Sequence, residues 1–195
     1  MGNSRGKGYS CKGAITKYSS GALKPPCTET LKPHLKMKDS VAALAWITNE
    51  LTQRGIPFAV VGGLASNAYG GSRPLNDIDI DVPDAALPML ALELEAYRTF
   101  GPGHSISECF DCQLLGLSYM GQDIELSGAE SLLILDRSCS RWMPWPTDLR
   151  KIEERRVLGM AVPVMERGAL IAYKELAGRD TDLIDVSELR ACYNN

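Results

Sequence analysis

The chain has 195 residues, 45% of them hydrophobic, with six cysteines and only two histidines. This length fits one domain with or without a tail, and no apolar stretch approaches the roughly 20 residues that span a bilayer. The net charge of −3 hides an asymmetry, because residues 1–38 carry eight of the 21 basic residues and one of the 24 acidic residues.

Two regions of different composition follow from this asymmetry. Residues 1–38 are rich in Gly, Ser and Lys and lack apolar periodicity, which predicts a disordered basic tail. That tail is either a solubilising extension or an arm for a nucleic acid or acidic partner. Residues 39–195 hold 13 basic and 23 acidic residues and are expected to form one acidic domain. Without an apolar signal segment, we expect a cytoplasmic protein with reduced thiols and no membrane contact.

The apolar pattern predicts helices and strands that alternate along the domain. The first is a helix from Asp39 or Ser40 to about Arg54, which a short polar side chain caps and Gly55 ends. After it we expect, in chain order, a strand at 57–61, a helix at 64–69, a strand at 77–82, a helix at about 88–100, strands at 105–110, 113–120 and 122–126, a short helix at 129–136, an irregular segment at 141–146, a charged helix from 148, an extended segment at 157–165, and helices at about 167–177 and 183–193.

This order of elements predicts an α/β (α+β) fold. It has a small mixed central sheet flanked by helices, and its C-terminal end is helical.

The segment VVGGLASNAYGGSRPLNDIDIDV, residues 60–82, is the most informative stretch of the chain. Its last strand carries Asp77, Asp79 and Asp81 at alternate positions, so the three carboxylates face one way while their apolar neighbours face the core. Like charges in a row repel each other, and a bound divalent cation usually offsets this repulsion. The segment therefore predicts a metal-dependent site for phosphate chemistry.

The same segment resembles a known signature. Gly62-Gly63, a short helix, Arg73 and then Asp77-Ile78-Asp79 occur in an order similar to that of the nucleotidyltransferase superfamily. This superfamily includes minimal nucleotidyltransferases, aminoglycoside and lincosamide nucleotidyltransferases, and the nucleotidyltransferase toxins of abortive-infection systems.

The end of the chain resembles a recurrent ending in bacterial members of the superfamily. There a strand precedes a helix that bears a lysine, and a GR-x-x-D-x-x-D segment follows. The corresponding residues here are Lys174, Gly178, Arg179, Asp182 and Asp185. The two matches together cover the domain from about residue 40 to its end.

The chemistry of these residue types agrees with the resemblance. In-line attack on the α-phosphorus of a nucleoside triphosphate (NTP) needs charge neutralisation and alignment. Carboxylates at Asp77 and Asp79 can hold Mg²⁺ or Mn²⁺. Gly62 and Gly63 let the backbone approach phosphates, and the helix that follows offers free N–H groups.

Two cations are candidates for contact with the donor. Arg73 precedes the carboxylates in the sequence and is expected to bind the triphosphate. Lys174 lies on an otherwise apolar helix, where it either reaches the phosphates or carboxylates or is an exposed, snorkelling lysine. Arg179, Asp182 and Asp185 are expected to form ion pairs at helix ends.

The resemblance implies a third carboxylate on a neighbouring strand, as general base or second metal ligand. Glu125 fits best because it stands between Ile124 and Leu126, while Asp123 beside the turn is the alternative. Asp81 is an auxiliary candidate only.

These residues favour an Mg²⁺-dependent nucleotidyltransferase that moves a nucleoside monophosphate from NTP to a hydroxyl of a small molecule, such as an antibiotic. The alternatives are a nucleotidyltransferase toxin that modifies tRNA or protein, and a non-catalytic nucleotide-binding module of the same fold. Larger antibiotic-modifying members of the superfamily usually carry a helical acceptor domain, whereas only 70 residues follow Glu125 here. A homodimer is therefore one way to complete the acceptor site. The sequence names neither the acceptor nor the preferred NTP.

Overall fold

The computed structural model describes residues 38–192, so the predicted tail lies outside the described residues apart from Lys38. The strands are β1 (Ala59–Val60), β2 (Asp77–Val82), β3 (Arg98–Ile106), β4 (Phe110–Tyr119), β5 (Gln122–Gly128), β6 (Leu133–Asp136), β7 (Arg141–Pro144), β8 (Ile152–Val157) and β9 (Met160–Met165). The helices are α1 (Ser40–Gln53), α2 (Gly62–Ala68), α3 (Leu87–Glu93), α4 (Arg167–Ala177) and α5 (Asp180–Ala191), with short 3₁₀ turns at Asp84–Ala86 and Glu95–Tyr97.

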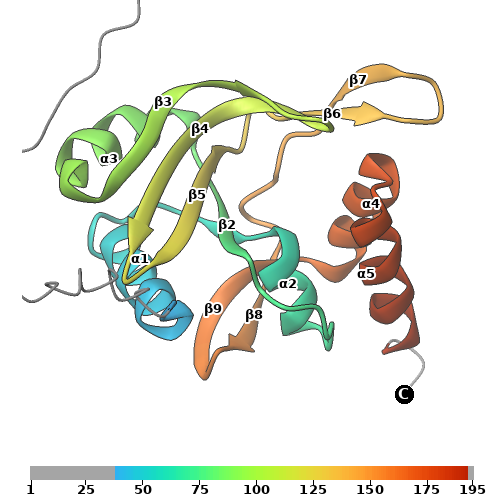
Figure 1. Cartoon of the computed structure of the whole chain (residues 1–195), viewed down its shortest axis with the longest axis horizontal. Helices are drawn as coiled ribbons and strands as arrows, with labels where there is room; N and C mark the ends of the chain where they lie inside the picture. The colour runs from blue at the N-terminus through green and yellow to red at the C-terminus, as the bar shows by residue number, and fades with distance from the viewer. Residues whose placement is uncertain (1–37, 193–195) are drawn as a thin grey trace, which may run out of the picture. The chain divides into compact units, whose positions relative to one another are not determined.

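The strands form one mixed nine-stranded sheet, in the order β7-β6-β4-β5-β2-β1-β9-β8, with β3 paired to β4 (Figure 1). The two central strands, β2 and β5, run parallel, whereas β1 is antiparallel to β2 and parallel to β9. Ile78, Ile80 and Ile124 lie on the core side of these strands and are fully buried. The predicted α+β architecture with a helical C-terminal end is confirmed.

The helices cover the sheet through apolar faces. The side chain of Asp39 caps α1 by accepting a hydrogen bond from the Ala42 N–H at 2.9 Å, as predicted. Leu44, Ile47 and Leu51 of α1 are buried in the core. Helices α4 and α5 pack side by side at one end of the sheet (Figure 1). Among residues 38–192, no helix has the length and apolar character that crossing a membrane requires.

The predicted helix at 88–100 is wrong in its second half. Helix α3 ends at Glu93, and after a 3₁₀ turn the chain enters β3 at Arg98. Residues 98–106 form a ladder with β4, and this long-range pairing decides the local structure. The strand expected at 105–110 accordingly lies several residues earlier in the chain.

Three further segments were predicted wrongly, and all of them are strands. Residues 133–136 and 141–144 form the β6–β7 hairpin, in which Pro144 ends an edge strand that does not need its N–H as a donor. The charged segment after Asp148 becomes β8, where exposed and half-buried side chains alternate from Ile152 onward. Its hairpin with β9 replaces the charged helix. Helix α5 begins at Asp180, three residues before its predicted start.

Candidate active site

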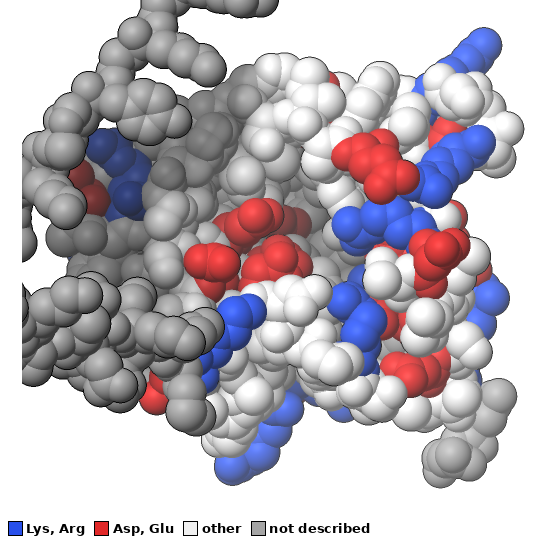
Figure 2. Space-filling view, viewed as in Figure 1, with Lys and Arg blue, Asp and Glu red and all other residues white. Residues whose placement is uncertain are grey.

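A cleft of about 400 Å³ opens between the central strands and the C-terminal helices. Figure 2 shows acidic side chains gathered in a hollow over β2 and β5, with basic side chains beside it toward α4 and α5. All seven residues that the sequence singled out line this cleft: Gly62, Gly63, Arg73, Asp77, Asp79, Glu125 and Lys174.

The acidic wall of the cleft follows from the pairing of β2 with β5. Asp79 lies opposite Glu125, and Asp77 lies opposite Asp123, in a parallel register. Because side chains alternate along both strands, all four carboxylates point to the same face of the sheet. Burial, followed by the charges of Asp77 and Glu125, raises the pKa of Asp79 to about 8, while Lys174 opposes this shift. Burial likewise raises the pKa of Glu125, together with Asp77 and Asp123.

Asp81 lies deeper along the same row and differs from its neighbours. Its side chain is buried, and the Thr147 hydroxyl donates a hydrogen bond to its Oδ2 at 2.6 Å. Burial raises the pKa of Asp81 to about 7 in spite of this bond. Asp81 thus has a protein partner of its own.

Gly62 and Gly63 are the first two residues of α2, rather than a turn before it as predicted. Gly62 has φ +61°, and a Cβ atom there would lie 1.9 Å from Oδ2 of Asp79. A Cβ at Gly63 would lie 2.9 Å from Nη2 of Arg73. A carboxylate and a guanidinium therefore rest against bare backbone, which only glycine permits at this separation.

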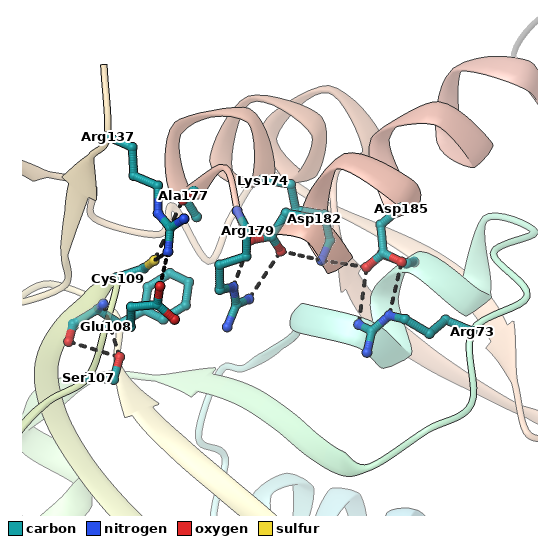
Figure 3. Close-up of polar contacts among 12 residues, drawn as sticks. Arg73, Ser107, Glu108, Cys109, Arg137, Lys174, Ala177, Arg179, Asp182 and Asp185 are labelled. Atoms are coloured by element: carbon teal, nitrogen blue, oxygen red, sulfur yellow. Dashed lines mark hydrogen bonds and ion pairs between the residues drawn. The ribbon is translucent and has the colours of Figure 1, made fainter. Parts of the chain in front are cut away.

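The basic wall of the cleft is formed around Lys174, whose side chain is 1% exposed. Lys174 Nζ lies 2.8 Å from Oδ2 of Asp185 and 3.4 Å from Oδ1 of Asp182 (Figure 3). The interpretation of Lys174 as an exposed or snorkelling lysine is therefore wrong. Arg73 Nε pairs with Asp185 at 3.2 Å and Arg179 Nε pairs with Asp182 at 2.7 Å. Asp182 thus forms the expected ion pair at the start of α5, whereas Asp185 lies within the helix, and both side chains are fully buried.

Two aromatic side chains also line the cleft, and no sequence pattern indicated them. The rings of Phe110 and Tyr173 stack with centroids 5.5 Å apart, and the Arg179 guanidinium lies 4.9 Å from the Phe110 centroid. No local motif marks Phe110 or Tyr173. Trp142 and Trp145 do not line the cleft.

A second cavity of about 430 Å³ adjoins the first. The two cavities share Asp77 and Glu125, so the acidic row lies at their junction. Asp123 lines only the second cavity, together with Lys38 and Phe100. Of the two candidates for the third carboxylate, Glu125 is thus the one that faces both cavities.

The donor groups in the cleft suit a hard divalent cation. Within residues 38–192, no three acidic, histidine or cysteine side chains converge closely enough to enclose a metal ion by themselves. Mg²⁺ does not require such a cage, because one or two carboxylates and the phosphates of a substrate usually complete its shell. The raised pKa of Asp79 reflects uncompensated burial and negative charge, which a cation would offset.

One cysteine, Cys112, lines the cleft. The four cysteines within the described residues are free thiols, and both Cys109 and Cys112 are buried. Burial raises the pKa of the Cys112 thiol to about 11.

No protein-family model matches this sequence, and no curated protein matches it either. Solved structures do match. The Thermotoga maritima protein TM1012, which has been assigned as a nucleotidyltransferase, is 19% identical over 79% of this chain and 92% of its own, with a TM-score of 0.57. The lincosamide antibiotic adenylyltransferase LnuA, bound to lincomycin, is 14% identical over 77% of this chain and 96% of its own (TM-score 0.51).

A third structure is that of ANT(2″)-Ia in complex with adenylyl-2″-tobramycin. It is 19% identical over 80% of this chain and 89% of its own, with a TM-score of 0.52. At these identities the likeness establishes the fold, and the resemblance seen in the sequence is confirmed at that level. The chain has the fold of the nucleotidyltransferases.

Proposed function

We propose that this protein is a nucleotidyltransferase that moves a nucleoside monophosphate from an NTP to a hydroxyl of a small molecule. The observation that carries the proposal is one cleft with two chemically opposite walls. Asp77, Asp79 and Glu125 line its acidic side, and Arg73 and Lys174 line its basic side. Phosphoryl transfer needs both, since carboxylates bind the cation and basic groups bind the polyphosphate.

The donor NTP would lie in the first cavity. Gly62 and Gly63 lack Cβ atoms, so Asp79 and Arg73 can lie directly against their backbone, where they would face the metal and the triphosphate. Arg73 and Lys174 would bind the triphosphate and set its orientation. Phe110 and Tyr173 line the same cavity, and the nucleoside would lie beside them.

The acceptor would lie in the second cavity, which meets the first at Asp77 and Glu125. Its volume of about 430 Å³ is that of a small-molecule site. Two of the structural neighbours, LnuA and ANT(2″)-Ia, were solved with lincomycin and with adenylyl-2″-tobramycin, respectively. Asp123 adds negative charge to this cavity, which favours an acceptor with a positive charge.

In the proposed step, an acceptor hydroxyl oxygen forms a bond to the α-phosphorus while the bond from that phosphorus to the pyrophosphate oxygen breaks. Glu125, which lines both cavities, would accept the hydroxyl proton. Pyrophosphate leaves with its charge held by Arg73 and Lys174. Asp77, Asp79 and Glu125 would hold Mg²⁺ or Mn²⁺, which supplies charge neutralisation for the carboxylates and phosphates when bound.

The experiment is transfer from α-³²P-labelled NTPs, with Mg²⁺, to a panel of small-molecule acceptors that includes lincosamides and aminoglycosides. The wild-type chain should produce a nucleotide adduct detectable by mass. The variant Asp77→Asn with Asp79→Asn should produce none while it retains its fold by circular dichroism, and unchanged transfer in this variant would refute the proposal.

The same assay distinguishes the proposed small-molecule enzyme from the two alternative functions. An adduct on tRNA or on a protein would identify a modifying toxin instead of a small-molecule enzyme. A thermal shift with Mg²⁺ and one NTP but no adduct on any acceptor would identify a nucleotide-binding module.

A further inference from the structure

The carboxylate of Asp185 joins three segments at one end of the cleft. Its side chain is 0% exposed and accepts four hydrogen bonds. Oδ1 accepts from Arg73 Nε at 3.2 Å, and Oδ2 accepts from Arg73 Nη2 at 3.2 Å and from Lys174 Nζ at 2.8 Å. The fourth donor is the Ser66 hydroxyl, 3.2 Å from Oδ2. The donors come from α2, from the loop at 69–76 and from α4, and Figure 3 shows the pairs with Arg73 and Lys174.

Asp182, about one turn earlier on α5, is likewise a buried acceptor for cations that line the cleft. It accepts from Arg179 Nε at 2.7 Å and Nη2 at 3.1 Å, and it lies 3.4 Å from Lys174 Nζ. Three cations that line the cleft thus share two buried carboxylates. These three cations and two carboxylates together carry a net charge of +1, on the side of the cleft that faces the acidic row.

Stability alone is a weak explanation for this arrangement. Buried ion pairs are often no more stabilising than apolar side chains of similar volume, because the charges must be removed from water. The pairing does, however, define where the cations lie. Asp185 engages Nε and Nη2 of Arg73, which fixes the plane of the guanidinium and leaves Nη1 outside the pair. Nη2 is also the atom that lies against Gly63.

We infer that Asp185 is a positioning residue that holds Arg73 and Lys174 in the geometry that binds the triphosphate, an inference that rests on the proposed function. Asp185 itself lies behind these cations and acts through them. Removal of its charge should therefore weaken the binding of the donor, and the loss should depend on the presence of Arg73.

The test is the dissociation constant of each NTP with Mg²⁺, measured by calorimetry on the full chain. Asp185→Asn keeps the shape of the side chain and should raise this constant at least about tenfold, as expected when a charged hydrogen-bond partner is lost. Glu175→Gln is the matched control, because Glu175 pairs with Arg190 between the same two helices on their exposed side. It should leave the constant within about twofold of the wild type, as expected for an exposed ion pair.

A double-mutant cycle with Arg73→Ala separates positioning from general stabilisation. If Asp185 acts through Arg73, Asp185→Asn should weaken binding much less in the Arg73→Ala background than in the wild type. Equal losses in both backgrounds, or no loss in the single variant, would overturn the inference. A wild-type chain that binds no NTP would instead overturn the proposed function.

A measurement on the wild type covers the case in which Asp185→Asn does not fold. The ¹⁵Nε–H resonance of Arg73, assigned with Arg73→Lys, should exchange slowly with water before NTP is added and shift when it is added. Arg150, whose side chain is 90% exposed while its Nε donates to Asp148, provides the reference for a guanidinium in an exposed ion pair. Exchange as fast as that of Arg150 would contradict the inference.

Discussion

Substitution of Gly62 by alanine is the sharpest test of the cleft geometry. The added Cβ would lie 1.9 Å from Oδ2 and 2.7 Å from Cγ of Asp79, so the carboxylate must move. The backbone at Gly62 also has φ +61°, which costs an L-residue roughly 1–2 kcal/mol. Displacement of a packed group adds about 1–3 kcal/mol. The free energy of unfolding should therefore fall by about 2–5 kcal/mol in total.

Gly55 offers a control for the backbone contribution to this cost. Its φ is +64°, and nothing lies within 4 Å of a Cβ placed there. Gly55→Ala should therefore lose only the roughly 1–2 kcal/mol of the backbone conformation. The difference between the two variants, measured by urea unfolding, isolates the contact between Gly62 and Asp79.

The assay pairs this unfolding measurement with the thermal shift that Mg²⁺ and NTP produce. Gly55→Ala should keep the shift, whereas Gly62→Ala should lose it because Asp79 is displaced. In an Asp79→Ala background, the excess cost of Gly62→Ala should shrink. Equal losses of stability in Gly55→Ala and Gly62→Ala, with the thermal shift kept in both, would refute the close approach of Asp79 to the backbone.

Three further outcomes test other regions of the site. Gly63→Ala should change stability little, because the 2.9 Å contact is with the end of the Arg73 side chain, but should weaken NTP binding in calorimetry. Glu125→Gln should abolish transfer while it leaves donor binding measurable. Asp123→Asn should alter mainly the KM for the acceptor. The reverse result would make Asp123 the third carboxylate. Burial acts to raise the pKa of Asp185, but Arg73 and Lys174 outweigh it and hold that pKa below 3.8. The stability that this charge contributes is therefore complete above about pH 5 and falls as the pH drops through the lowered pKa, so urea unfolding of wild type and Asp185→Asn should converge in acid.

The carboxylate row could be predicted because its signal is local. Alternation in DIDIDV sets both the strand and its two faces, and the pattern around Glu125 gives the neighbouring strand in the same way. Gly62 and Gly63 were expected to admit phosphates beside a turn; in the structure they begin α2, and the side chains of Asp79 and Arg73 lie against them. Such features depend on residues a few positions apart.

The missed features depend on partners far away in the sequence. Arg73 and Asp185 are 112 positions apart, and no pattern near either residue shows that they meet. The charges of β8 suggested a helix, yet the strand forms because β9 supplies its ladder. The prolines at 144 and 146 suggested an irregular segment, yet an edge strand tolerates Pro144. Tertiary pairing decides each of these cases.

The dependence of the basic wall on α5 has a consequence for the order in which the protein becomes competent. This helix is the last element of the described chain, and it supplies the counter-charges for cations that come from much earlier segments. During synthesis, the sheet and its acidic row can assemble while Arg73 and Lys174 still lack Asp185. Affinity for a polyphosphate would therefore depend on the docking of this helix.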